Sequence, residues 1–72
     1  MRIIMTTIGQ NIRQLRKERG MTQEELAACL NVSAQAVSKW EMETCSPDIS
    51  LIVPLSTLFG VSADVLFGIS PD

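Results

Sequence analysis

The sequence predicts an all-helical domain. Apolar residues recur three and four positions apart along most of the chain, a spacing that places them on one face of an α-helix. Ser or Thr precedes most of these segments and Gly or Asn follows them, and these residue types begin and end helices. No segment alternates apolar and polar residues as a half-buried β-strand would. The 72 residues, 46% of them apolar, are expected to form one domain over 1–72 with its core at about 7–68.

Two capping boxes mark the first two helices. The first helix starts near Thr7, where the Thr7 hydroxyl and the Gln10 side chain can each accept a bond from the other residue's backbone N–H. Gly20 ends this helix, because glycine readily adopts the left-handed conformation that closes a helix. Thr22 and Glu25 repeat the capping-box pattern at the start of the second helix.

The remaining helices are bounded by the same kinds of residue. Ser33 and Ser62 can each cap a helix start, and Gly60 and Gly68 stand at helix ends. Pro54 fits a helix without a kink only within its first turn, because proline has no backbone N–H to donate. We therefore expect a third helix at about 33–42, a loop at 43–50, a fourth helix from 51 or 52 to 59, and a short fifth helix carrying Leu66 and Phe67.

Residues 23–42 have the pattern of two helices joined by a tight turn. Ala27 is small where the second helix must pass close to the third, and Asn31 tolerates the positive φ that the turn requires. The residues between the apolar positions are mostly polar, which leaves one face of the third helix free for a groove. This combination indicates a helix-turn-helix. The positions expected to face the shared core are Leu26, Leu30, Val32, Val37 and Trp40.

The charge distribution is only weakly suited to a polyanionic partner. The formal net charge is −2, and most of the bases lie before Gly20. From Thr22 onward Lys39 is the only base. The summed field would therefore attract DNA weakly at long range.

Several function classes are excluded by what the sequence lacks. It has no His, no glycine-rich phosphate loop and no nucleophile beside a plausible base, so we do not expect an enzyme or a cofactor. Two cysteines without histidine cannot complete a four-ligand zinc site in one chain, so no metal is expected either. Cys29 and Cys45 are interpreted as free thiols in a reducing cytoplasm, with a disulfide as the alternative. No apolar run is long enough to span a bilayer.

Three stretches of the chain resemble the Cro/cI-type, or XRE, family of helix-turn-helix regulators: IGQNIRQLRKERGMTQEELA, VSKWE and LFGVSADVLFG. The resemblance covers about residues 7–68. It implies a compact five-helix, lambda-repressor-like DNA-binding domain with the helix-turn-helix in helices 2 and 3. It also implies a sequence-specific, cytoplasmic transcriptional regulator, most often a repressor. Such a protein binds double-stranded DNA as a dimer, with the third helix in the major groove.

The resemblance also implies roles for individual residues. Gln23, at the start of the second helix, would contact a phosphate, and Arg16 and Glu41 would form an ion pair between the first and third helices. The loop departs from the family pattern, because Glu43 stands where the family often has Gly followed by a base. Base-reading roles fall on Ala34, Gln35, Ser38 and Lys39, and phosphate contacts on Arg13, Gln23, Thr44 and Ser46.

The C-terminal end carries more apolar residues than a short helix can bury against its own domain. We therefore expect a homodimer surface there, formed by Val61, Ala63, Val65, Leu66, Phe67 and Ile69. The alternative function is a protein-interaction module, such as an antitoxin or anti-repressor with a toxin or other protein as its partner. The acidic balance of the chain motivates this alternative. The sequence leaves open the operator, the effector, and whether the chain is complete or part of a longer regulator.

Overall fold

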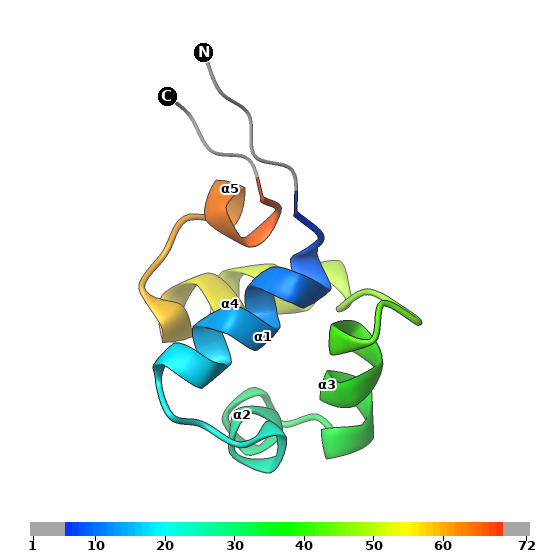
Figure 1. The fold of residues 1–72 in the computed structure, drawn as a ribbon. Helices are drawn as coiled ribbons and strands as arrows, with labels where there is room; N and C mark the ends of the chain where they lie inside the picture. The colour runs from blue at the N-terminus through cyan, green and yellow to red at the C-terminus, as the bar shows by residue number, and fades with distance from the viewer. Residues whose placement is uncertain (1–5, 69–72) are drawn as a thin grey trace.

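In the computed structural model, which describes residues 6–68, the chain folds into short helices around one core (Figure 1). The described residues contain helical elements and turns only, as the sequence predicts. No helix in this part of the chain combines the length and apolar character of a membrane span. The elements are α1 (Ile8–Glu18), α2 (Gln23–Leu30), α3 (Ala34–Glu41), the 3-10 helix η1 (Ile49–Leu51), α4 (Ile52–Phe59) and α5 (Ala63–Leu66).

The helix ends form where the capping residues predict them. Thr7 and Thr22 each make a complete capping box, with both reciprocal hydrogen bonds present. Asn31 closes α2 in the left-handed conformation at φ 58°, and Gly60 closes α4 at φ 66°. These ends depend on side chains within three residues of the helix, and sequence alone can therefore locate them.

Two boundaries differ from the prediction. Residues 49 and 50, expected in the loop, form η1 together with Leu51, because Asp48 accepts hydrogen bonds from both the backbone N–H and the hydroxyl of Ser50 and so closes a turn there. α5 ends at Leu66, so Phe67 occupies the C-cap position and its side chain is half exposed. Pro54 lies in the first turn of α4, where its missing N–H has no helical partner to lose.

The core is built from one to three side chains of every α-helix. Trp40 is buried in it, as predicted, and belongs to the structural side of α3. The prediction that Leu66 belongs to a dimer surface is wrong, because its side chain is 0% exposed within its own domain. The buried apolar residues are Ile12, Leu26, Ala27, Leu30, Val37, Trp40, Leu55, Phe59 and Leu66.

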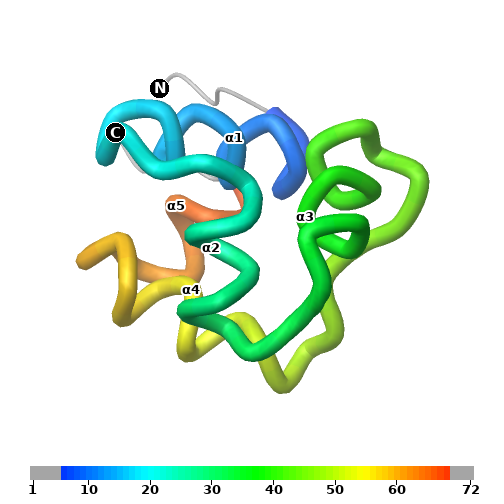
Figure 2. Tube along the Cα trace, turned by 90° about the horizontal axis from the view of Figure 1, so that it is seen from below, coloured from blue at the N-terminus to red at the C-terminus, as the bar shows by residue number. Residues whose placement is uncertain are grey.

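The helices are arranged so that α1 packs against both α3 and α5, while α2 packs against α3. Figures 1 and 2 show α1 and α4 on opposite sides of the molecule, with α3 at one edge. Gly9 lets α1 approach α3, because a Cβ at this position would lie 1.9 Å from the carbonyl oxygen of Trp40. At Gly9, α3 is thus held against α1 at backbone distance.

Candidate nucleic-acid interface

One side of α3 faces away from the core and carries the four residues predicted to read bases. Val37 and Trp40 are buried on the inner side of the helix. Gln35 and Lys39 are exposed on the outer side, and Ser38 is half-buried beside them. Ala34 is also half-buried and packs against the core with part of its surface, so only the remainder of its methyl group faces outward. The recognition face is defined here as Ala34, Gln35, Ser38, Lys39 and Met42.

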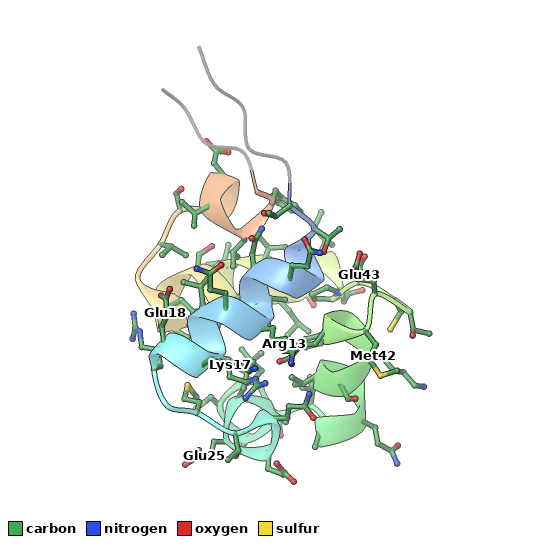
Figure 3. All side chains as sticks on the ribbon, in the orientation of Figure 1. Arg13, Lys17, Glu18, Glu25, Met42 and Glu43 are labelled. Atoms are coloured by element: carbon green, nitrogen blue, oxygen red, sulfur yellow. The ribbon has the colours of Figure 1, made fainter. Side chains whose placement is uncertain are left out.

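Met42 joins this face although the sequence did not single it out. It lies four residues after Ser38, which places both on the same side of the helix, and the Ser38 hydroxyl lies 3.7 Å from the Met42 sulfur. Its side chain is 73% exposed and projects outward from the end of α3 (Figure 3). The helical spacing from Gln35 and Ser38 would have been enough to include it.

An ion pair ties α3 to α1 directly behind the recognition face. Arg16 Nε donates to one carboxylate oxygen of Glu41 at 2.7 Å, and Arg16 Nη2 donates to the other at 3.0 Å. The Arg16 and Glu41 side chains are only 11% and 4% exposed. A third guanidinium hydrogen bond runs from Nη1 to the carbonyl of Met21 at 2.7 Å. The pairing that the family resemblance implied is present, with the two-fork geometry that fixes orientation.

The electrostatics of this pair favour its charged form. Burial alone would raise the pKa of Glu41, but hydrogen bonds from Arg16 and Gln23 outweigh burial, and the pKa of that carboxyl is lowered. The hydrogen bond to Glu41 raises the pKa of Arg16. Both groups therefore stay ionised at neutral pH.

Gln23 links the start of α2 to the same carboxylate. Its side-chain amide donates to Glu41 Oε1 at 3.1 Å, so one of its hydrogen bonds is made inside the protein. The first backbone N–H groups of a helix have no intrahelical acceptor and form a partly positive end. Arg13, Arg16, Gln23, Ser38, Glu41 and Met42 together line an open groove between α1, α2 and α3.

The basic residues divide into structural and exposed ones. Arg19 donates to the carbonyl oxygens of Leu58 and Phe59, and thus caps the end of α4. Arg16 is occupied by Glu41. Arg13 and Lys17 are exposed and project from α1 on the side of α2 and α3 (Figure 3). A charge count from sequence overstates the bases available to a ligand, because two of the five within residues 6–68 are used for folding.

The loop after α3 makes its turn without glycine. Glu43 adopts the left-handed conformation at φ 63°, and the N–H of Thr44 donates to the carbonyl of Lys39 at 2.9 Å. This is the Schellman arrangement, which favours glycine at the position that Glu43 occupies. Thr44 and Ser46, the predicted loop contacts, are both exposed. The carboxylate of Glu43 therefore stands beside the polar groups expected to face phosphate.

The described residues offer little for metal or redox chemistry. Cys29 and Cys45 are both free and exposed. Within residues 6–68, no three His, Cys, Asp or Glu side chains gather where they could hold a metal ion. On α3 and the loop after it, the exposed polar side chains are amide, hydroxyl and ammonium groups together with the Glu43 carboxylate, a set that suits hydrogen bonding to a polar ligand.

Comparisons with known proteins agree with this geometry. A family model described as helix-turn-helix matches residues 12–66. The regulator ImmR of Bacillus subtilis is 34% identical over 62 residues, which cover 86% of this chain and 49% of ImmR.

Two solved structures with similar folds contain DNA. The P22 c2 repressor in complex with a synthetic operator matches with a TM-score of 0.80 and 31% identity, covering 86% of this chain and 94% of that one. The biofilm regulator SinR in complex with DNA matches with a TM-score of 0.74 and 34% identity, covering 83% of this chain and 97% of that one. The chain spans about half the length of several curated relatives that it matches.

Proposed function

This chain belongs to the Cro/cI-type (XRE) helix-turn-helix family of transcriptional regulators, and we propose that it reads operator DNA with the recognition face of α3 in the major groove. The observation that carries the proposal is the two-sided character of α3, with Val37 and Trp40 buried and Gln35 and Lys39 exposed. A helix in the major groove needs an outward face of hydrogen-bonding side chains on a rigidly held backbone. This role implies a cytoplasmic location.

The side chains of the recognition face suggest which bases they suit. Gln35 has the donor and acceptor that pair bidentately with adenine, and Lys39 can donate to guanine. The exposed part of the Ala34 methyl group suits the methyl group of thymine. Each good pairing of this kind contributes roughly 1–3 kcal/mol of discrimination against the wrong base.

Phosphate contacts are proposed along the groove and the loop. Arg13 lies on the rim of the groove beside α3, and the start of α2 offers the Gln23 amide together with unpaired backbone N–H groups. Thr44 and Ser46 would contribute hydroxyl donors from the loop. Glu41 holds Gln23 in place for such a contact, because the amide retains a second N–H after donating to the carboxylate.

We propose that the protein binds as a dimer and represses transcription. A single module of this size buries too little DNA surface for tight selective binding, and paired half-sites about one helical turn apart are the usual solution. Of the C-terminal residues expected at the dimer surface, Val65 and Phe67 are 43% and 48% exposed and Ala63 is also exposed. Val61 packs partly against the core, and Ile69 lies outside the described residues.

Selection of binding sites from random duplex DNA tests this proposal. The purified protein should enrich a two-fold symmetric motif. A variant with Gln35, Ser38 and Lys39 all changed to Ala should lose that motif while keeping its helical circular dichroism spectrum. A control with Gln14 and Ala28 changed to Ser alters exposed residues of α1 and α2 outside the recognition face and should enrich the same motif. Absence of enrichment at low salt, from a folded protein, would count against DNA reading.

A second candidate function is a protein-interaction module, such as an antitoxin that binds a toxin. The net charge of −2 and the carboxylate of Glu43 in the loop favour it. The two functions differ in how binding depends on salt, because phosphate contacts release counterions and give a steep decrease in affinity as salt rises. A DNA affinity that is independent of salt between about 50 and 200 mM would favour the interaction module.

A further inference from the structure

Met42 lies on the central line of the recognition face, although none of the base contacts proposed above involves it. Its backbone N–H donates to the carbonyl of Ser38 at 2.9 Å, so the helical path of α3 continues through this residue. Met42 is the seventh residue after Gln35, and seven residues make close to two full turns of an α-helix. Both side chains therefore project along the same outward line, with Ser38 on one side of it and Lys39 on the other.

The Met42 side chain is apolar and faces away from its own domain. It is 73% exposed, whereas Trp40, on the inner side of the same helix, is 4% exposed. A thioether is only a weak hydrogen-bond acceptor, so Met42 offers a ligand dispersion contact and no strong hydrogen bond. Its unbranched, flexible chain can adapt to the shape of the surface that it meets.

The groove between α1, α2 and α3 places Met42 beside a proposed phosphate contact. Met42 and Arg13 line this groove together. A phosphate held by Arg13 would bring a DNA strand close to the end of α3, where Met42 projects (Figure 3). The bases next to that phosphate are then within reach of the Met42 side chain.

The major groove offers such a side chain one kind of apolar group, the C5 methyl group of a pyrimidine. The other groups on the base edges are hydrogen-bond donors and acceptors, which a thioether serves poorly. Thymine carries the C5 methyl group, and 5-methylcytosine carries it at the same position of the ring. A side chain that contacts only this group distinguishes pyrimidines by the presence of the methyl and not by their pairing.

We propose that Met42 reads the C5 methyl group of one pyrimidine in each half-site, so that methylation of a cytosine at this position strengthens binding. The inference rests on the proposed function for the placement of α3 in the major groove, and on the position and chemistry of Met42 for the contact. Seven residues span about 10 Å along a helix, which corresponds to roughly three base pairs. The methyl group should therefore lie about three base pairs from the base that Gln35 contacts.

Fluorescence anisotropy with synthetic duplexes of the operator found by site selection tests the proposal. Each pyrimidine of a half-site is replaced in turn by cytosine, 5-methylcytosine, thymine and deoxyuridine, at one salt concentration. At one position, 5-methylcytosine should bind about fourfold tighter than cytosine, and thymine about fourfold tighter than deoxyuridine, because each pair differs by one methyl group that becomes buried. Comparing both pairs separates the methyl group from the rest of the base.

Three variants assign the effect to its residue. Met42→Ala should bring both affinity ratios at this position to about one, whereas Met42→Leu keeps an apolar side chain of similar size and should retain them. Gln35→Ala is the matched control on the same line of the helix. It should lose the base preference at its own position, about three base pairs away, and keep both methyl ratios. Circular dichroism melting checks that all three variants fold.

The possible outcomes separate this inference from the proposed function. The inference is overturned if the operator is bound specifically but no methyl effect disappears in Met42→Ala, and the proposed function then stands. It is also overturned if Met42→Ala weakens binding to methylated and unmethylated duplexes equally, which would place Met42 against the sugar–phosphate backbone. Failure of the unchanged protein to bind any duplex selectively would refute the proposed function and this inference together.

Discussion

Replacing Arg16 with Ala should destabilise the domain far more than the loss of a surface ion pair would. The substitution removes both hydrogen bonds that Glu41 receives from the guanidinium, and the bond to the carbonyl of Met21. Exposed ion pairs contribute about 0–1 kcal/mol, whereas breaking a buried pair costs about 3–5 kcal/mol because one charge is left without its partner. The Glu41 side chain is 4% exposed, which places this pair in the buried class.

The expected loss of stability is smaller than that for a fully unpaired buried charge, because Glu41 keeps one hydrogen-bond partner. Gln23 still donates to Glu41 in the variant, so the carboxylate keeps one hydrogen bond. We therefore expect a loss of about 2–4 kcal/mol in the free energy of unfolding. A domain of this size loses roughly 4–8 °C of melting temperature per kcal/mol, so Arg16→Ala should melt at least about 8 °C lower. Thermal melting followed by circular dichroism at neutral pH measures this.

The dependence on pH distinguishes the charge effect from simple loss of packing. The pKa of Glu41 is lowered in the folded protein, so the pair stabilises the fold above the ordinary glutamate range and this contribution is lost as pH falls through the lowered pKa. In Arg16→Ala the buried carboxyl lacks its counter-charge, and protonation relieves the strain. The gap in melting temperature between the two proteins should therefore narrow as pH falls from about 6 to 3.

Two results would refute this reasoning. A decrease of less than about 3 °C at neutral pH would mean that the pair behaves as an exposed one. A gap that stays constant from pH 6 to 3 would assign the loss to packing instead of charge. Arg13→Ala is the matched control on the same helix, because Arg13 is exposed and not paired with Glu41 in this way. Arg13→Ala should change the free energy of unfolding by no more than about 0.5 kcal/mol. It should reduce the slope of log DNA affinity against log salt concentration by about one, because one phosphate contact is lost.

Substitutions at three other positions, Gly9, Glu43 and Met42, test the contacts around α3. Gly9→Ala should lower the free energy of unfolding by about 2 kcal/mol or more despite its better helix propensity, because the new Cβ would meet the Trp40 carbonyl. Gly20→Ala has open space around the Cβ and should lower the free energy of unfolding by about 1 kcal/mol, because of the positive φ at this position. Urea unfolding of both variants measures the difference. Glu43→Gly should stabilise the protein by up to about 1 kcal/mol, because glycine adopts the positive φ of this position without strain, and it should tighten DNA binding at low salt. Glu43→Gln removes the charge but keeps the side chain, so it should tighten binding without changing stability. Equal effects of the two variants on stability would show that Glu43 is not strained. Met42 is exposed on the recognition face, where its apolar side chain can contact a thymine methyl group in addition to the one assigned to Ala34. Met42→Ala should then remove the loss of affinity caused by replacing that operator thymine with deoxyuridine, and an unchanged loss would exclude Met42 as a reader of the methyl group.

The parts of the fold set by neighbouring residues were predictable from sequence. The capping boxes at Thr7 and Thr22 and the left-handed Asn31 were located correctly because each depends on side chains only a few positions away. The division of α3 into a buried and an exposed side was also predictable, since the burial of Val37 and Trp40 follows from helical spacing. The family resemblance added the Arg16–Glu41 pair, which joins residues that no local rule connects.

The errors arose where tertiary contacts decide. Leu66 was expected on an outer surface, yet α5 packs against α1 and α4 and encloses it. One local signal was available: Val61 precedes the Ser62 cap and Leu66 is the fourth residue of the helix, which is the spacing of a hydrophobic staple. For Arg19, in contrast, no local sequence signal was available. Nothing in its neighbourhood predicts that it donates to carbonyls at the end of α4, some forty residues away.

The use of bases for folding also limits how this protein could bind DNA. Among residues 6–68, only Arg13, Lys17 and Lys39 are both basic and free of the internal contacts that hold Arg16 and Arg19. Even if all three contacted phosphate, the logarithmic salt slope would reach only roughly −2.7 per copy and roughly −5 for a dimer, and it is shallower still if Lys39 contacts a guanine as proposed. So shallow a slope gives one copy little non-specific affinity, and selective binding must then come from base contacts and from the second copy. A measured slope much steeper than −5 on a two-half-site duplex would contradict this account, because it would require cations that the described domain does not offer.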